Sequence, residues 1–314
     1  MDRGFKLTMC RAYLIIQKVS FDHVSHVARF IHGTLRDSFG PDTNLIVCDQ
    51  IDEADHVDNA IIFVIGEGFR PHTRRPGCTY VYLNFSIVAV MGNPLHMSKV
   101  GWSAIRRKRR MLIEKQAGFD VLLDYFGPQT LRLQRQMDMP VFGFGVAVDP
   151  GAINTSTPMS DRPFDVCFVG SMTPRRQKVM DALAALGLRV SPHSGVVYED
   201  IAAQSRCCIN IHAHRSNHLE TPRIIGAMAA GIPVVTEPSY GLGELLPPDL
   251  VTTSRLGHLP ETVRGLLNKP DMLVRNQQAV RNWYEKIYLN QCRTQWASIC
   301  LKVSDLARKR PKPS

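Results

Sequence analysis

The sequence lacks any apolar run long enough to cross a membrane. A spanning helix needs roughly 20 mostly apolar residues, and the longest candidate, Thr79 to Met91, is interrupted by Asn84 and Ser86. The N-terminal residues also lack the short apolar core and small-residue cleavage site of a secretory signal peptide. Both absences predict a cytoplasmic protein.

The cysteine pairs that mark zinc sites are missing as well. Eight cysteines are present, but none belongs to a C-x-x-C pair. Four of them, Cys48, Cys167, Cys207 and Cys208, lie in apolar stretches, where a free thiol behaves as a small hydrophobic side chain. The sequence therefore predicts neither a structural zinc site nor a disulfide framework.

Acidic residues are scarce relative to basic ones. The chain has 38 Lys and Arg against 28 Asp and Glu, a net charge of +10, and the second half is the more basic one. Such a surface fits a phosphate-bearing ligand, an anionic membrane surface or a nucleic acid. The densest cluster, Ile105 to Arg110, would suit peripheral membrane contact or a nucleic acid, although a solvated basic helix face is the favoured interpretation.

Short apolar stretches separated by helix-length connections are typical of parallel α/β sheets. In the first half the predicted strands are residues 11–16, 44–48, 59–65, 78–85, 119–124 and 140–146. A helix is predicted from about Asp22 to Phe39, because apolar residues recur there at helical spacing. This half has no G-x-G-x-x-G, so a dinucleotide-binding fingerprint is not supported.

The α/β pattern starts again after a polar stretch rich in Ser, Thr, Pro and Asp. We therefore predict two Rossmann-like α/β domains, residues 1–150 and 164–290, joined by a linker over 151–163. Residues 291–314 are expected to form a C-terminal helix and a basic tail, with the C-terminal helices packing back onto the domains. One long helical region is predicted from Asp271 to about Leu306, and a strand over Leu188 to Val190.

Two loops of the second domain follow predicted strands, at the edge where open α/β sheets bind ligands. The first contains Gly170 and Ser171, which let backbone approach a ligand, and then Arg175 and Arg176 at a helix start. Backbone donors together with a guanidinium suit a diphosphate.

The second loop leads into the stretch His218 to Val235, which reads as a loop, a small-residue helix and a buried strand. It brings His218, Glu220 and Arg223 to a helix start, where an anion can bind. A carboxylate there could accept hydrogen bonds from ribose hydroxyls. An ordinary αβ unit would show the same spacing, so each loop is a weak signal and the two together a stronger one.

Residues 164–270 resemble the C-terminal, donor-binding half of GT-B-fold glycosyltransferases, and are most similar to the family 1 group that includes CgeB-like proteins. The likeness is carried by D-V-C-F-V-G-S with R-R downstream, by C-I-N-I-H, and by R-I-I-G-A-M-A-A-G-I-P-V-V. It implies two Rossmann-like domains facing across a cleft that holds a sugar nucleotide, with the diphosphate held by Arg175 or Arg176. The sequence contains no D-x-D, and in such enzymes basic side chains and a helix dipole can neutralise the leaving diphosphate. Neither a metal nor another cofactor is therefore expected.

One position departs from the family pattern. The glutamate that usually contacts the nucleotide ribose is Gly226 here. Glu220 and His218 are therefore the catalytic candidates, while the donor-binding candidates are Gly170, Ser171, Arg175, Arg176 and Arg223. Acceptor-side candidates are His23, after the first predicted strand, and Glu67, after the third.

The leading hypothesis is a metal-independent glycosyltransferase that moves a sugar from a nucleotide sugar to an acceptor. The basic surface would suit a lipid-linked or polysaccharide glycan, a protein or a nucleic acid as that acceptor. One alternative is a degenerate homologue that acts as a non-catalytic binding protein, and another is a phage-type DNA glycosyltransferase. Nucleotide binding separates the first two, and steep salt-dependent DNA affinity would indicate the third.

Overall fold

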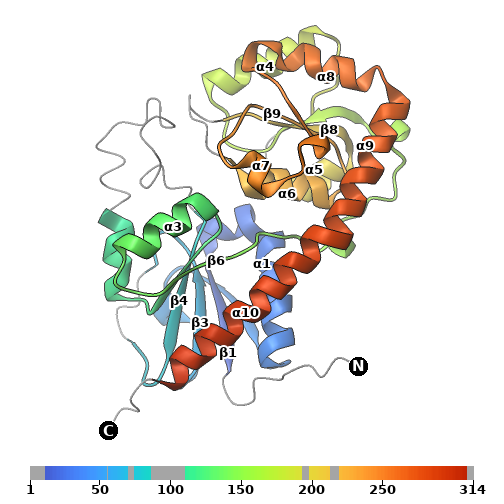
Figure 1. Ribbon diagram of the computed structural model, residues 1–314. Coiled ribbons are helices and arrows are strands. Elements are labelled where there is room, and N and C mark those ends of the chain that lie inside the picture. The colour runs from blue at the N-terminus through green and yellow to red at the C-terminus, as the bar shows by residue number, and fades with distance from the viewer. Residues whose placement is uncertain are drawn as a thin grey trace. The chain divides into compact units, whose positions relative to one another are not determined.

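The computed structural model describes residues 11–54, 56–69, 74–85, 110–192, 198–212 and 219–309, without the side chains at positions 22, 23, 198 and 199. These residues divide into two compact units (Figure 1). The first unit contains the described residues up to Val146 and those from Gln291 onward, and the second contains Ala147 to Asn290. The C-terminal segment that we set apart as residues 291–314 thus groups with the first unit.

The first unit is built on a six-stranded parallel sheet in the order β2-β1-β3-β4-β5-β6. Its strands are β1 (Ala12–Gln17), β2 (Asn44–Cys48), β3 (Ile61–Ile65), β4 (Thr79–Asn84), β5 (Val121–Asp124) and β6 (Val141–Gly143). Its helices include α1 (Lys18–Phe39), α3 (Gly127–Gln136) and most of α10 (Leu289–Arg308). All five residues of β3 are buried, as expected for a parallel strand covered on both faces.

Trp296 of α10 fixes that helix to the first unit. Its indole is fully buried, packs on Phe63 and Phe144, and donates a 3.0 Å hydrogen bond from Nε1 to the backbone oxygen of Gly145. A Cβ at Gly145 would collide with the sulfur of Cys292, so the glycine permits this close approach. Truncating a buried tryptophan typically costs about 3–5 kcal/mol, which makes this contact a main anchor of α10.

The second unit has a four-stranded parallel sheet in the order β10-β9-β8-β7. Its strands are β7 (Phe164–Cys167), β8 (Ser205–Asn210), β9 (Val234–Thr236) and β10 (Val251–Thr253). Its helices are α4 (Pro174–Ala185), α5 (Tyr198–Ala203), α6 (Thr221–Ala229), α7 (Leu242–Leu245), α8 (Leu259–Leu267) and α9 (Pro270–Trp283). Figure 1 shows α4 and α8 on one side of this sheet and α5 and α6 on the other.

Two predicted elements differ from the structure. The stretch Leu188 to Val190 is not a full strand, because only Val190 bridges to Val166 of β7. The single helical region predicted from Asp271 is divided into α9, a π-helical turn over Tyr284–Tyr288, and α10. Two hydrogen bonds of the Tyr284 hydroxyl hold this turn in place. The hydroxyl donates to the backbone oxygen of Val148 at 2.7 Å and accepts from the backbone N–H of Val148 at 2.8 Å.

Both units therefore have the predicted α/β architecture, with parallel Rossmann-like sheets and C-terminal helices packed against them. Among the described residues, no helix combines the length and apolar character that crossing a membrane requires.

Candidate functional site

The candidate site lies where the connections of the second sheet change direction. From β7 the chain passes through α4 to Val190, on one side of β7, whereas from β8 it passes through α6 to β9, on the other side. The loops after β7 and β8 therefore diverge at the carboxyl ends of two neighbouring strands. Open α/β sheets bind ligands at such a topological switch point.

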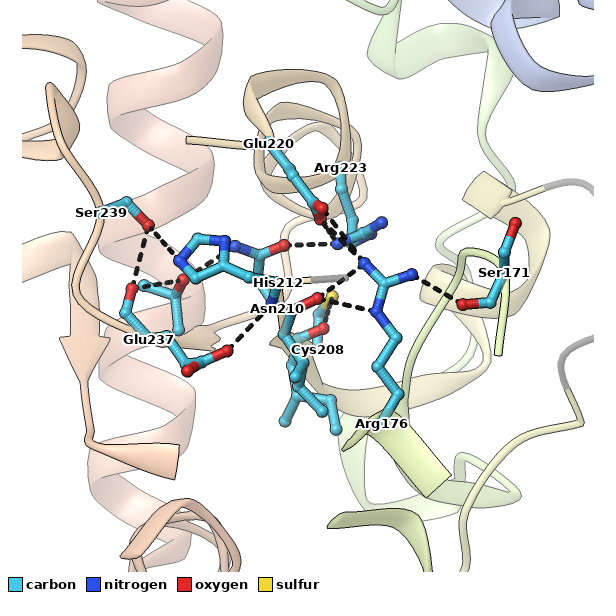
Figure 2. Close-up of polar contacts among 12 residues, drawn as sticks. Ser171, Arg176, Cys208, Asn210, His212, Glu220, Arg223, Glu237 and Ser239 are labelled. Carbon is cyan, nitrogen blue, oxygen red and sulfur yellow. Dashed lines mark hydrogen bonds and ion pairs between the residues drawn. The ribbon is translucent and has the colours of Figure 1, made fainter. Parts of the chain in front are cut away.

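Arg176 is the most deeply buried cation of the site, with a side chain that is only 3% exposed. Its Nε and Nη2 donate to the backbone oxygen of Ile211 at 3.0 and 2.8 Å, and its Nη1 donates to the backbone oxygen of Ser171 at 2.7 Å (Figure 2). Burial, and next the neighbouring charge of Arg175, lower the pKa of Arg176 to about 10, so the guanidinium stays charged at neutral pH. Arg176 thus ties the loop after β7 to the end of β8.

Glu220 lies between two guanidinium groups at the start of α6. It accepts a 3.1 Å hydrogen bond from Nη2 of Arg176 and forms an ion pair with Arg223 (Figure 2). Arg223 also donates from Nη1 to the side-chain oxygen of Asn210, at 2.6 Å. Pro222 sits in the first turn of α6, where its missing N–H costs no hydrogen bond. The carboxylate therefore cross-links the beginnings of α4 and α6.

The ring of Phe168 supports the same two arginines. The guanidinium carbons of Arg176 and Arg223 lie 4.9 and 5.0 Å from its centroid, within the range of a cation–π contact. Gly170 has a φ of +141°, and a Cβ there would lie 2.6 Å from Nη2 of Arg223. The loop after β7 therefore needs glycine at this position for both conformation and space.

Arg175 points to a second carboxylate, Glu237, which follows β9. Nη1 donates to Glu237 Oε2 at 2.7 Å and to the backbone oxygen of His212 at 3.1 Å, and Nη2 forms the other arm of the ion pair. Glu237 also accepts a 2.9 Å hydrogen bond from the backbone N–H of His212. One carboxylate thereby fixes Arg175 to the ends of β8 and β9.

The imidazole of His212 is buried beside this ion pair. Its Nε2 lies 3.2 Å from the Ser239 hydroxyl, which itself donates to the backbone oxygen of Glu237 at 3.0 Å (Figure 2). This bonding assigns the proton to Nε2. Burial lowers the pKa of His212, and the charge of Glu237 opposes that shift, so the ring is neutral at pH 7.

The charges of this cluster do not cancel. The guanidiniums of Arg175, Arg176 and Arg223 face the carboxylates of Glu220 and Glu237, which leaves one positive charge among these five groups. The first turns of α4 and α6 add partial positive charge. The arrangement can therefore hold an anion such as a diphosphate.

Most of the donor-binding candidates come together in this cluster. Gly170 lies beside Arg176 and Arg223, both of which pair with the catalytic candidate Glu220, and Ser171 contributes its backbone oxygen. Arg175 instead pairs with Glu237 at the ends of β8 and β9. His218 and the side chain of His23 lie outside the described residues. Glu67 is exposed in the first unit, two residues after the end of β3, and Gly226 is buried inside α6. In the described part of the chain, no three His, Cys, Asp or Glu residues are grouped so that they could hold a metal ion.

Four residues of the cluster were not among the candidates from sequence: Phe168, Asn210, His212 and Glu237. Asn210 and His212 belong to the C-I-N-I-H segment. The spacing of that segment did not indicate which of its side chains point toward the ligand-binding edge of the sheet, at the carboxyl ends of the strands. Glu237 lies two residues after the predicted buried strand, which ends at Val235. A charged residue in that position was the available signal.

No family model matches the chain. Uncharacterized protein L138 of Acanthamoeba polyphaga mimivirus is 31% identical over 119 residues, which is 33% of this chain and 13% of L138. The matched part is thus a small fraction of that protein's length.

Solved structures of similar fold cover most of the chain. HepE of Anabaena, solved in complex with UDP and glucose, has a TM-score of 0.62 at 13% identity, over 93% of this chain and 100% of HepE. TarM has a TM-score of 0.56 at 11% identity, over 77% of this chain and 55% of TarM. The chain therefore has the GT-B fold, with two Rossmann-like units, that glycosyltransferases of this kind share.

Proposed function

We propose that the protein is a nucleotide-sugar-dependent glycosyltransferase whose donor diphosphate binds at the cluster around Glu220. The observation that carries this proposal is the net positive cluster of three arginines at the switch point between β7 and β8. The complex of the similarly folded HepE with UDP and glucose supports the same ligand class.

The three arginines would have different roles in donor binding. The side chains of Arg175 and Arg223 are 21% and 14% exposed, so they can reach a ligand, whereas Arg176 is 3% exposed and bonded to protein through all its nitrogens. Arg175 and Arg223 would therefore contact the diphosphate, with backbone of Gly170 and Ser171 beside it. Arg176 would position the loop rather than touch the ligand.

Glu220 would act mainly through its neighbours. Its oxygens are occupied by Arg176 and Arg223, so its first role would be to orient both cations. It would contact the donor only if the ligand displaced one of them. His218 remains a candidate for contact with the sugar.

In the proposed reaction, an acceptor oxygen forms a bond to the anomeric carbon while the bond from that carbon to the diphosphate oxygen breaks. The leaving diphosphate gains negative charge, and the proton of the acceptor is transferred to a base. Arg175 and Arg223, already held by Glu237 and Glu220, would stabilise this charge without reorganising. Because cations of the chain itself would fill this role, we propose that transfer is metal-independent.

Further details are proposals from the sequence. They comprise membership of the CgeB-like group, a cytoplasmic location, peripheral membrane contact through the basic surface, and an acceptor that is a lipid-linked or polysaccharide glycan, a protein or a nucleic acid. Gly226, buried in α6 in place of a carboxylate, favours a second candidate, a non-catalytic binding protein with the same fold.

The test is to incubate the protein with a panel of nucleotide sugars and follow nucleoside diphosphate release. We expect release from at least one donor, and loss of it in Arg223→Ala. An Arg264→Ala variant is the matched control, because Arg264 is exposed on α8. Tight nucleotide binding without release or transfer would instead favour the binding protein.

A further inference from the structure

A groove of about 490 Å³ runs along α4 in the second unit, beside the cluster around Glu220, with which it has Arg175 in common. One wall is a stripe of α4 residues at helical spacing, namely Pro174, Arg175, Lys178, Val179 and Ala182. Residues four apart share a helix face, so this stripe is continuous over about 12 Å at 1.5 Å per residue.

The opposite wall comes from the start of α8 and the turn before it, through Leu256, Gly257 and Pro260. With Val179 and Ala182 facing them across the groove, both walls are mainly apolar. An open apolar surface of this length would gain affinity from each methylene group that a ligand buries in it.

The charges of the groove have one sign. Arg175 and Lys178 line it, and no Asp or Glu does. Arg175 is paired with Glu237, whereas the exposed Lys178 takes part in none of the ion pairs found within the described residues. An anionic group of a ligand would thus meet two cations beside the apolar walls, Arg175, which is already paired with Glu237, and the exposed Lys178.

We propose that this groove is a second ligand site, for an amphiphile that carries a phosphate group. The alkyl part lies between α4 and α8, against Val179, Ala182 and Leu256, and the phosphate lies at Lys178 and Arg175. The site goes beyond the proposed donor site and shares only Arg175 with it.

The experiment is calorimetric titration of the full chain with octyl phosphate, below the concentration at which it forms micelles. Butyl phosphate and inorganic phosphate serve as shorter probes. We expect affinity to rise at least tenfold from inorganic to octyl phosphate, because only the longer probe covers the apolar walls.

Two variants locate the binding. Lys178→Glu should weaken octyl phosphate by about tenfold or more, the effect of losing a charge-assisted contact. Ala182→Trp should abolish binding by filling the groove. Arg264→Glu and Ala185→Trp are matched controls, because both residues are exposed and neither lines the groove; they should bind octyl phosphate like the unaltered protein.

Vesicles distinguish the source of the ligand. Retention on phosphatidylcholine vesicles containing phosphatidic acid, lost in Ala182→Trp, would assign the groove to a membrane headgroup. Octyl phosphate binding without such retention would assign it to a lipid phosphate taken from solution. Either result supports the site.

Equal affinity for octyl and inorganic phosphate, or binding that both groove variants leave unchanged, would overturn the proposal. So would an equal loss of UDP and octyl phosphate binding in Lys178→Glu, since the groove would then belong to the donor. If the protein binds octyl phosphate but not UDP, the proposed donor site is contradicted and the groove proposal stands.

Discussion

Arg175 and Glu237 stand 62 residues apart in the sequence and form a two-armed ion pair at the edge of the second sheet. The same carboxylate accepts the backbone N–H of His212. This pair therefore joins the start of α4 to the ends of β8 and β9, and it holds one of the two cations that we assign to the donor diphosphate.

Glu237→Gln should loosen that arrangement. The amide keeps the size of the side chain but cannot form the charged pair, so Arg175 would be left partly desolvated without its counter-ion. We expect a loss of about 1–3 kcal/mol in the free energy of unfolding and weaker nucleoside diphosphate binding. Urea denaturation and calorimetry measure the two effects. Unchanged stability and affinity would show that the pair is dispensable. Glu244→Gln, at an exposed position on α7, is the control.

Gly170→Ala should damage the donor site directly. A Cβ at this position would lie 2.6 Å from Arg223 Nη2, and a φ of +141° is unfavourable for alanine. The arginine must then move away from the loop, so we expect reduced nucleotide affinity together with reduced thermal stability. In Gly265→Ala the new methyl group meets open space in a helix, and that control should be neutral or slightly stabilising. Equal behaviour of the two variants would contradict the packing described around Arg223.

The buried carboxylate of Asp124, in the first unit, predicts a pH effect on stability. Burial raises its pKa to about 6, although Asn84, Gln129, Phe126 and Thr130 donate hydrogen bonds that act against the shift. The Asp124 carboxyl therefore binds a proton more tightly in the folded state than in the unfolded state, where its pKa is 3.8. The stability contributed by this group is then present at about pH 4 and lost as pH rises through 6.

Comparing the unaltered protein with Asp124→Asn isolates this effect. The asparagine does not titrate there, so the stability of the unaltered protein relative to the variant should fall by up to about 3 kcal/mol between pH 4 and pH 7. Urea denaturation at both values provides the measurement. A difference that stays constant, or grows with pH, would mean that the carboxyl is not shifted upward.

Removal of divalent metal tests the proposed chemistry. Because Arg175 and Arg223 would neutralise the leaving diphosphate, sugar transfer should persist in excess EDTA at more than about half of its original rate, a barrier change of well under 1 kcal/mol. Assays of donor turnover with EDTA, and with Mg²⁺ or Mn²⁺ restored, give the comparison. Activity that EDTA abolishes and Mn²⁺ restores would reject metal independence.

Local sequence patterns were sufficient to predict the α/β units and the two loops after β7 and β8. Gly170, Arg175, Glu220 and Arg223 were chosen as candidates because strand ends, helix starts and glycines carry local signals, and the structure places them at those loops. Which of two adjacent arginines is buried was not predictable in the same way. That outcome depends on the phase of α4 and on where Ile211 and Ser171 offer their backbone oxygens.

The unpredicted features depend on distant contacts. Glu237 and His212 lie together in the site because β9 and β8 are neighbours in the sheet. The helix α10 belongs to the first unit because Trp296 packs there and donates a hydrogen bond to the backbone oxygen of Gly145. Neither contact can be predicted from the local spacing of apolar residues. Leu188 to Val190 has a strand-like composition, yet in the described part of the chain it forms an isolated β-bridge, Val190 to Val166, rather than a strand.

The most direct measurement is calorimetric titration of the full chain with UDP, GDP and dTDP, repeated with Arg223→Ala and with the Arg264→Ala control. We predict that at least one nucleotide binds, that Arg223→Ala weakens it by about 1–3 kcal/mol, and that Arg264→Ala leaves it unchanged. The absence of binding by all three nucleotides, or binding that is the same in Arg223→Ala, would contradict a donor site between β7 and β8.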